Sequence, residues 1–183
     1  MSNKQENIYR IELAADQPAL YALKYGNEIL GTLAFDATHG SRARANIGGR
    51  SLLLKRKKVF KKDIHIHEHE DRLPVARFSA TALRGTLSFG STTYAWIPTN
   101  ALLTSWAWQD PAGNELLRVS QKLNFFETQG EVCAERPLTA HIEKLLALLG
   151  WHLVLLGHQD PGAHLISSLE VYLGNQRSHT LKS

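Results

Sequence analysis

A run of apolar residues near the end of the chain limits what this sequence can fold into more than any other feature. From Leu145 to Leu156 the run is interrupted only by Gly150 and His152, so a helix here is apolar on every side. Such a helix has to be buried, either inside a protein or in a bilayer. A membrane span needs about 20 apolar residues, whereas roughly 10–14 are typical of a buried core helix. Because charged residues flank the run, we expect a core helix near residues 139–157.

The chain before this run has the pattern of short strands separated by turns. Two glycine-containing pairs, Gly26-Asn27 and Gly48-Gly49, suit two-residue hairpin turns, because glycine accepts positive φ angles. We expect strands over residues 8–13, 20–25, 28–35, 41–47, 50–56, 64–69, 75–80, 85–89, 92–98, 102–108, 115–121 and 130–134. About a dozen short strands at this spacing predict a mainly β sandwich or barrel.

Length and composition indicate one globular domain. The 183 residues contain 43% hydrophobic and 21% charged residues, as ordinary soluble domains do. We expect residues 1–160 to form the β domain and residues 161–183 a tail with a short helix. The single cysteine, Cys133, fits a reducing compartment, and the polar N-terminus has no apolar leader, so we expect a cytoplasmic protein.

Three segments carry a resemblance to a known family. They are the turn and strand at 26–31 (GNEILG), the aromatic strand and Asp-x-x-Gly turn at 105–117 (SWAWQDPAGNELL), and the apolar run from Leu145 to Leu156. Together they resemble the tubby-like superfamily, which includes tubby domains, phospholipid scramblases and LURP-one-related proteins. The resemblance implies a closed antiparallel barrel of about twelve strands around a central hydrophobic helix. It also implies a non-enzymatic protein, and phosphoinositide binding by basic residues on the barrel exterior as in the tubby branch.

The most uneven feature of the charge distribution is a basic segment. Residues 37–62 contain nine Lys and Arg residues and no acidic residue, within a chain of net charge +4. A cluster of this kind binds anionic lipid headgroups with about 1 kcal/mol per basic residue near the surface. The candidate anion-binding residues are Arg42, Arg44, Lys55, Arg56, Lys57, Lys58, Lys61 and Lys62.

Two other interpretations of the basic segment stay open. A solvated edge strand is often made basic to prevent association between sheets. Nucleic-acid binding also uses basic grooves, but single-strand binding needs exposed stacking aromatics, and Phe60 is the only aromatic residue within this segment.

A histidine-rich stretch follows directly. His65, His67 and His69 alternate, so a strand would place them on one face, where imidazoles could bind zinc or a similar metal. The alternatives are an exposed polar strand face, or a pH-dependent surface if the histidines lie near the lysines.

No catalytic motif is present. Cys133 and His141 are the only nucleophile and base pair worth considering, and a lone cysteine is usually a small buried hydrophobe. We expect His152 to be a core histidine, either bonded to a barrel group or at the helix exit, and not a ligand. The sequence therefore predicts a non-enzymatic module, without a cofactor, that engages anionic phospholipid headgroups as a peripheral membrane protein. The alternative is a structural or protein-interaction barrel without a small-molecule ligand.

Overall fold

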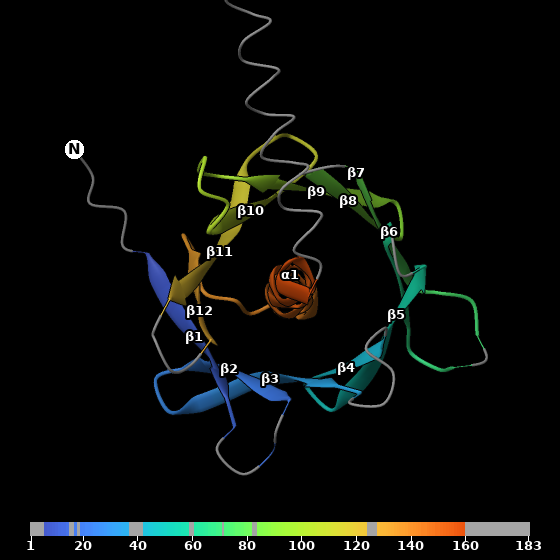
Figure 1. Ribbon diagram of the computed structural model, residues 1–183, viewed down its shortest axis with the longest axis horizontal. Coiled ribbons are helices and arrows are strands. Elements are labelled where there is room, and N and C mark those ends of the chain that lie inside the picture. The colour runs from blue at the N-terminus through green and yellow to red at the C-terminus, as the bar shows by residue number, and fades with distance from the viewer. Residues whose placement is uncertain are drawn as a thin grey trace, which may run out of the picture.

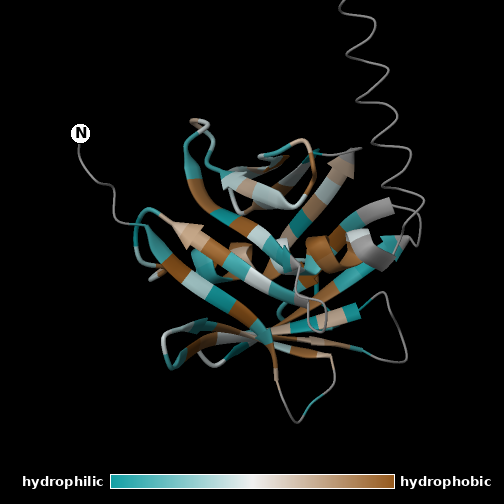
Figure 2. Ribbon diagram, turned by 60° about the vertical axis from the view of Figure 1, so that its left-hand side comes forward, coloured by the Kyte–Doolittle hydropathy of each residue, from teal (hydrophilic) through white to brown (hydrophobic). Residues whose placement is uncertain are grey.

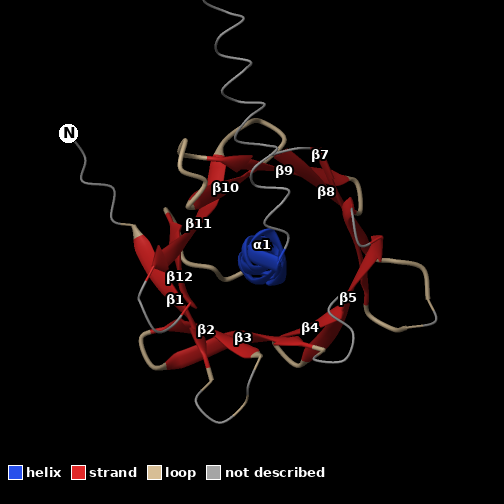
Figure 3. Ribbon diagram, viewed as in Figure 1, coloured by secondary structure: helices blue, strands red, loops and turns tan. Residues whose placement is uncertain are grey.

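The computed structural model describes residues 6–14, 17, 19–36, 42–58, 61–70, 72–81, 84–123 and 128–159. Its twelve strands form a closed antiparallel barrel that surrounds one helix (Figure 1; Figure 3). Each strand pairs with the next along the chain, and β12 closes the ring on β1. The fold expected from the sequence is confirmed, and it is a barrel, not a sandwich. The predicted tail at 161–183 lies outside the described residues.

The strand boundaries agree closely with those expected. The elements are β1 (Asn7–Leu13), β2 (Leu20–Tyr25), β3 (Glu28–Phe35), β4 (Arg42–Ile47), β5 (Arg50–Lys58), β6 (Lys61–His67), β7 (Ala76–Thr81), β8 (Arg84–Phe89), β9 (Thr92–Pro98), β10 (Ser105–Gln109), β11 (Glu115–Leu123), β12 (Thr128–Ala134) and α1 (His141–Gln159).

Two predicted strands are displaced. The strand expected at 64–69 lies at Lys61–His67, and the one expected at 102–108 begins only at Ser105. In the second case Asn100 explains the difference, because its side chain bonds the backbone N–H and the hydroxyl of Thr104 and holds the preceding residues in a turn.

Residue alternation decides which side of each strand faces the helix. In β4 and β5 the buried side chains are Ala43, Ala45, Leu52 and Leu54, and the residues between them face outward. The same alternation of hydrophobic and hydrophilic residues appears along most strands in Figure 2. The barrel therefore has one apolar interior, which the helix shares.

The helix packs closely against the inner face of the barrel. Its leucines are buried around the whole circumference, and it packs against β3, β4, β10 and β11. A helix is about 10–12 Å across with its side chains, so only a barrel of many strands can hold one. Glycines permit the closest approaches: a Cβ on Gly130 of β12 would lie 2.7 Å from the Trp151 ring. A Cβ on Gly150 of α1 would lie 3.0 Å from the Trp108 and Trp96 rings.

The start of the helix differs from the prediction. The helix was expected near residues 139–157, but α1 begins at His141, and Glu143 in its first turn performs the capping. Its Oε2 accepts the backbone N–H groups of Thr139 at 3.1 Å and Ala140 at 3.0 Å. This is the returning half of a capping box, in which an acidic residue in the first turn satisfies free N–H groups.

Candidate functional site

Four aligned side chains form a cationic row on the outer face of the barrel. In β4–β7 the cross-strand partners are Arg42 with Lys55, Lys55 with His65, and His65 with Arg77. Their neighbours along the strands, such as Leu54 and Ile64, are buried inside. Arg42 and Lys55 are like charges directly opposite each other, which is destabilising in a sheet, so this pair favours an anion beside it.

Two further basic side chains extend this surface. Arg44 and Lys57 are exposed, and both alternate with residues of β4 and β5 that face the interior. Arg44 Nη1 lies 3.5 Å from the Ser51 hydroxyl, at the outer limit of a hydrogen bond. We call the side chains of Arg42, Arg44, Lys55, Lys57 and Arg77 the cationic face. The surface also carries the carboxylates of Asp63 and Glu70, so five positive charges face two negative ones.

The acidic stretch that follows β6 folds back against the basic one. Glu70 Oε1 lies 3.2 Å from both Arg42 Nη1 and Lys55 Nζ. Its pKa is lowered mainly by the hydrogen bond from Lys55, followed by the charges of Lys55, Arg42 and Arg44. Glu68 lies 3.9 Å from Arg50 Nη1. The connection between β6 and β7 extends outward beside β5, at the right of Figure 1.

The structure places the other predicted anion-binding residues differently. Arg56 alternates with Leu52 and Leu54, which are buried in the barrel, and its charge acts on the buried His152. It therefore does not belong to the cationic face. Lys58, Lys61 and Lys62 lie in β5 and β6, but their side chains are outside the described part of the chain.

The three histidines do not converge. The His65 and His67 rings lie on the outer face with centroids 6.1 Å apart, whereas His69 follows the end of β6 in a turn. His67 Nδ1 donates a hydrogen bond of 2.9 Å to the Arg72 carbonyl. Within the residues that the structure describes, no three His, Cys, Asp or Glu side chains are placed to hold a metal ion.

His65 is the titratable member of the cationic row. Partial burial lowers its pKa, and the charges of Lys57 and Arg77 lower it further, whereas Asp63 acts in the opposite direction. The imidazole is therefore neutral near pH 7, and an anion bound beside it would favour its protonated form. The histidines thus lie near the basic residues, as one of the alternative interpretations expects.

One buried histidine lies inside the barrel. His152 is 1% exposed, its ring centroid is 5.1 Å from that of Phe35, and neither ring nitrogen has a hydrogen-bond partner among the described residues. The expected bond to a barrel group is therefore not found there. Burial, with a smaller contribution from Arg56, lowers the pKa of His152 to about 3.

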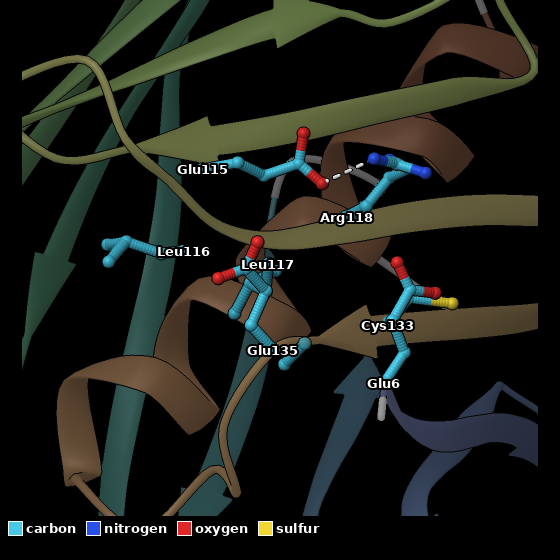
Figure 4. Close-up of a pocket in the computed structure, with 8 residues that line it drawn as sticks. Glu6, Glu115, Leu116, Leu117, Arg118, Cys133 and Glu135 are labelled. Atoms are coloured by element: carbon cyan, nitrogen blue, oxygen red, sulfur yellow. Dashed lines mark ion pairs between the residues drawn. The ribbon is translucent and has the colours of Figure 1, made fainter. Parts of the chain in front are cut away.

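A small pocket of about 120 Å³ lies on the opposite side of the barrel from β5, between β11, β12 and the residues flanking them (Figure 4). Glu6, Glu115, Glu135, Arg118 and Cys133 line it. Arg118 Nη2 lies 2.8 Å from Glu115 Oε1. Burial and the charges of Glu131 and Glu6 raise the pKa of the Cys133 thiol, so it is a poor nucleophile.

The pair of Cys133 and His141 is divided by the fold. The charges that act on His141 include Arg50 and Glu68, on the β5–β6 side, whereas Cys133 lies at the pocket beside β11. The two side chains therefore do not form a nucleophile and base pair.

Within the part of the chain that the structure describes, the tryptophans of the barrel offer no stacking platform beside the cationic face. Trp96, Trp106 and Trp108 are at most 8% exposed, and the Trp96 and Trp106 rings stack with an interplanar angle of 6°. Phe60 lies outside the described residues. The tryptophans therefore contribute to the core and rim, as expected from the sequence.

Comparison of the chain with protein-family models, with curated proteins and with solved structures gives no match. The resemblance to the tubby-like superfamily therefore stays a prediction. Within the described ranges, no helix is both long and apolar enough to cross a bilayer.

Two members of the surface were not found by sequence reasoning. Arg77 is an isolated basic residue, and only its alternation with the buried Ala76 and Phe78 could have placed it on the outer face. Glu70 follows the histidine-rich stretch, and the sequence carries no signal that it turns back onto Arg42 and Lys55.

Proposed function

We propose that this protein is a non-enzymatic module that binds anionic phospholipid headgroups through the cationic face. The observation that carries the proposal is the register that aligns Arg42, Lys55, His65 and Arg77 across four adjacent strands. The sheet fixes the strand positions from which these side chains extend, so the basic groups are brought together before a ligand arrives. Preorganised charge reduces the entropic cost of binding.

The expected affinity follows from the charges. Five positive charges opposed by the two carboxylates of Asp63 and Glu70 leave three, which at about 1 kcal/mol each give roughly 3 kcal/mol at low salt, or about a 10²-fold preference for an anionic surface. This is a weak and reversible attachment. It is also sensitive to salt, because the Debye length falls to about 8 Å at physiological ionic strength.

The alternative of a structural or protein-interaction barrel is tested by the same experiment. Co-sedimentation with phosphatidylcholine vesicles, with and without about one quarter phosphatidylserine, is measured at about 50 and 300 mM salt. We expect binding only to the anionic vesicles and mainly at the lower salt concentration.

A matched pair of charge reversals locates the surface. Arg44→Glu should weaken binding by roughly ten- to thirtyfold, because reversal removes one favourable charge and adds an unfavourable one. Arg10→Glu makes the same change at an exposed outward position of β1, on the opposite side of the ring from β5, and should leave binding within about twofold.

Absence of binding to anionic vesicles at low salt would support the alternative barrel function. Equal losses in the two variants would show that only net charge matters.

A further inference from the structure

The contact between Glu70 and the cationic face fixes the position of one oxygen atom. Glu70 Oε1 lies 3.2 Å from Arg42 Nη1 and 3.2 Å from Lys55 Nζ. Arg42 and Lys55 are direct cross-strand partners on β4 and β5. A guanidinium and an ammonium group therefore converge on a single oxyanion position, which is the arrangement that a phosphate oxygen also satisfies.

Glu70 comes to this position from outside the sheet. It lies in the turn after β6 ends at His67, and its side chain is 54% exposed. The base of the connection is fixed by other bonds: the Val75 N–H donates to the Ile66 carbonyl at 2.8 Å, and His67 Nδ1 donates to the Arg72 carbonyl at 2.9 Å. The Glu70 carboxylate can therefore leave the two cations without any of these bonds breaking.

The exchange of this carboxylate for a phosphate is favourable on general grounds. Exposed ion pairs between side chains contribute little, because water screens them and two side chains are immobilised. A phosphate group has more oxygen atoms than a carboxylate, and each can accept a charge-assisted hydrogen bond from the neighbouring basic side chains. Arg44 is placed to join, since its charge already acts on Glu70.

Resting on the function proposed above, we propose that Glu70 is an internal counter-ion that occupies the headgroup site. The phosphate group of an anionic lipid displaces the Glu70 carboxylate and takes its place between Arg42 and Lys55. In the absence of a membrane, Glu70 neutralises part of the cationic face and so weakens its attraction for other anions. The acidic stretch after β6 thus sets the threshold at which the protein attaches to a surface.

The test compares Glu70→Gln with Glu28→Gln. Both changes remove one carboxylate charge from an exposed side chain, but Glu28 begins β3 and no ion pair involving it is found within the described residues. With vesicles of phosphatidylcholine and about one quarter phosphatidylserine, Glu70→Gln should bind roughly fivefold more tightly than the unaltered protein. Glu28→Gln should change binding by less than about twofold.

A double variant separates displacement from a general effect of charge. In the Arg42→Gln background one of the two cations that contact the Glu70 oxygen is already missing. Adding Glu70→Gln should then improve vesicle binding by clearly less than the fivefold expected from Glu70→Gln alone.

Competition by inorganic phosphate, compared with chloride at equal ionic strength, shows whether the site prefers a free phosphate or a lipid headgroup. We expect a similar loss of vesicle binding with either salt, because a free phosphate makes only part of the contacts with the surface.

The outcomes distinguish this inference from the proposed function. If the unaltered protein binds anionic vesicles and the two glutamine variants behave alike, the role of Glu70 is overturned and the proposed function stands. If none of the proteins binds, both are overturned. If phosphate releases the protein far more effectively than chloride, the position is a free-phosphate site and its assignment to a lipid headgroup is wrong.

Discussion

His152 is a polar side chain at the centre of an apolar interior, packed beside Phe35. An imidazole without hydrogen bonds costs free energy on burial, about 1–3 kcal/mol for an unsatisfied group, and a charged imidazole there costs far more. The low pKa of His152, about 3, follows from this burial. The folded protein therefore keeps this side chain neutral in mildly acidic solution, whereas the unfolded chain protonates it.

This difference predicts how His152 couples stability to pH. Between pH 6.5 and about 3 the unfolded state binds a proton at His152 that the folded state does not, so stability falls as the pH falls. The slope from one such group is at most about 1.4 kcal/mol per pH unit. His152→Leu should raise the free energy of unfolding at pH 7 by about 1 kcal/mol and make its decline between pH 6.5 and 4 shallower.

Urea unfolding at several pH values measures both effects. His69→Gln, which changes an exposed histidine, is the matched control and should leave the slope unaltered. An unchanged slope in His152→Leu would show that His152 has the same proton affinity in the two states.

Two contacts between single residues could not be predicted from the sequence. The apolar run predicted the buried helix, but hydrophobic periodicity does not predict which aromatic ring of the helix packs against the backbone of which strand. Gly130 and Trp151 are far apart in the sequence, yet a side chain on the first would collide with the second. The contact of Glu70 with Arg42 and Lys55 is of the same kind, because a turn determines it and no pattern encodes the path of that turn.

At the scale of single elements, the start of α1 depends on one carboxylate. Glu143 is 7% exposed and accepts the N–H groups of Thr139 and Ala140, while its other oxygen lies 3.0 Å from Arg136 Nη2. The chain before the helix is held as well, since the Leu138 N–H donates to the Tyr9 hydroxyl at 2.9 Å. These bonds position the helix where it enters the barrel.

Loss of the cap should destabilise the protein measurably. Glu143→Ala leaves the Ala140 N–H without its partner and removes one of the two acceptors of the Thr139 N–H, the other being the Pro137 carbonyl, so it should cost about 1–2 kcal/mol in the free energy of unfolding. Arg136→Ala leaves the cap in place and removes only the ion pair, whose arginine side chain is exposed, so it should cost less than about 0.5 kcal/mol. Chemical denaturation of the two variants measures the difference, and equal costs would mean that the ion pair, not the cap, is the stabilising contact.

The strands could be predicted from the alternation of their residues, whereas no such pattern marks the start of the helix. In a barrel most strands have one side facing solvent and one facing the interior, so their residues alternate with a period of two, although β10 is buried on both sides over four successive residues. Turn glycines such as Gly48 and Gly49, which have φ angles of 54° and 79°, mark the ends. At the start of α1, by contrast, the cap is Glu143, which accepts the N–H groups of Thr139 and Ala140 from inside the first turn, and hydrophobic periodicity does not locate such a contact.

At the scale of the whole molecule, barrel and helix depend on each other. The helix carries leucines on all sides and cannot remain helical in water without covering them. The barrel interior is lined by apolar side chains and would be left empty without the helix, at a cost that grows with the volume of the cavity. Neither part has a stable state of its own, so the described barrel should be one cooperative unit.

Equilibrium unfolding tests this dependence with separate probes. In Trp151→Phe the remaining tryptophans, Trp96, Trp106 and Trp108, all lie in the barrel, so fluorescence follows the strands while far-UV circular dichroism includes the helix. We expect the two signals to give the same midpoint in urea, and a single slope in the range of roughly 1–3 kcal/mol per molar that two-state domains show. The unaltered protein, in which Trp151 adds a probe on the helix, should give the same agreement. A loss of helical signal before the barrel fluorescence changes would mean that the helix can leave an intact barrel, and the interior would then have to be stable without it.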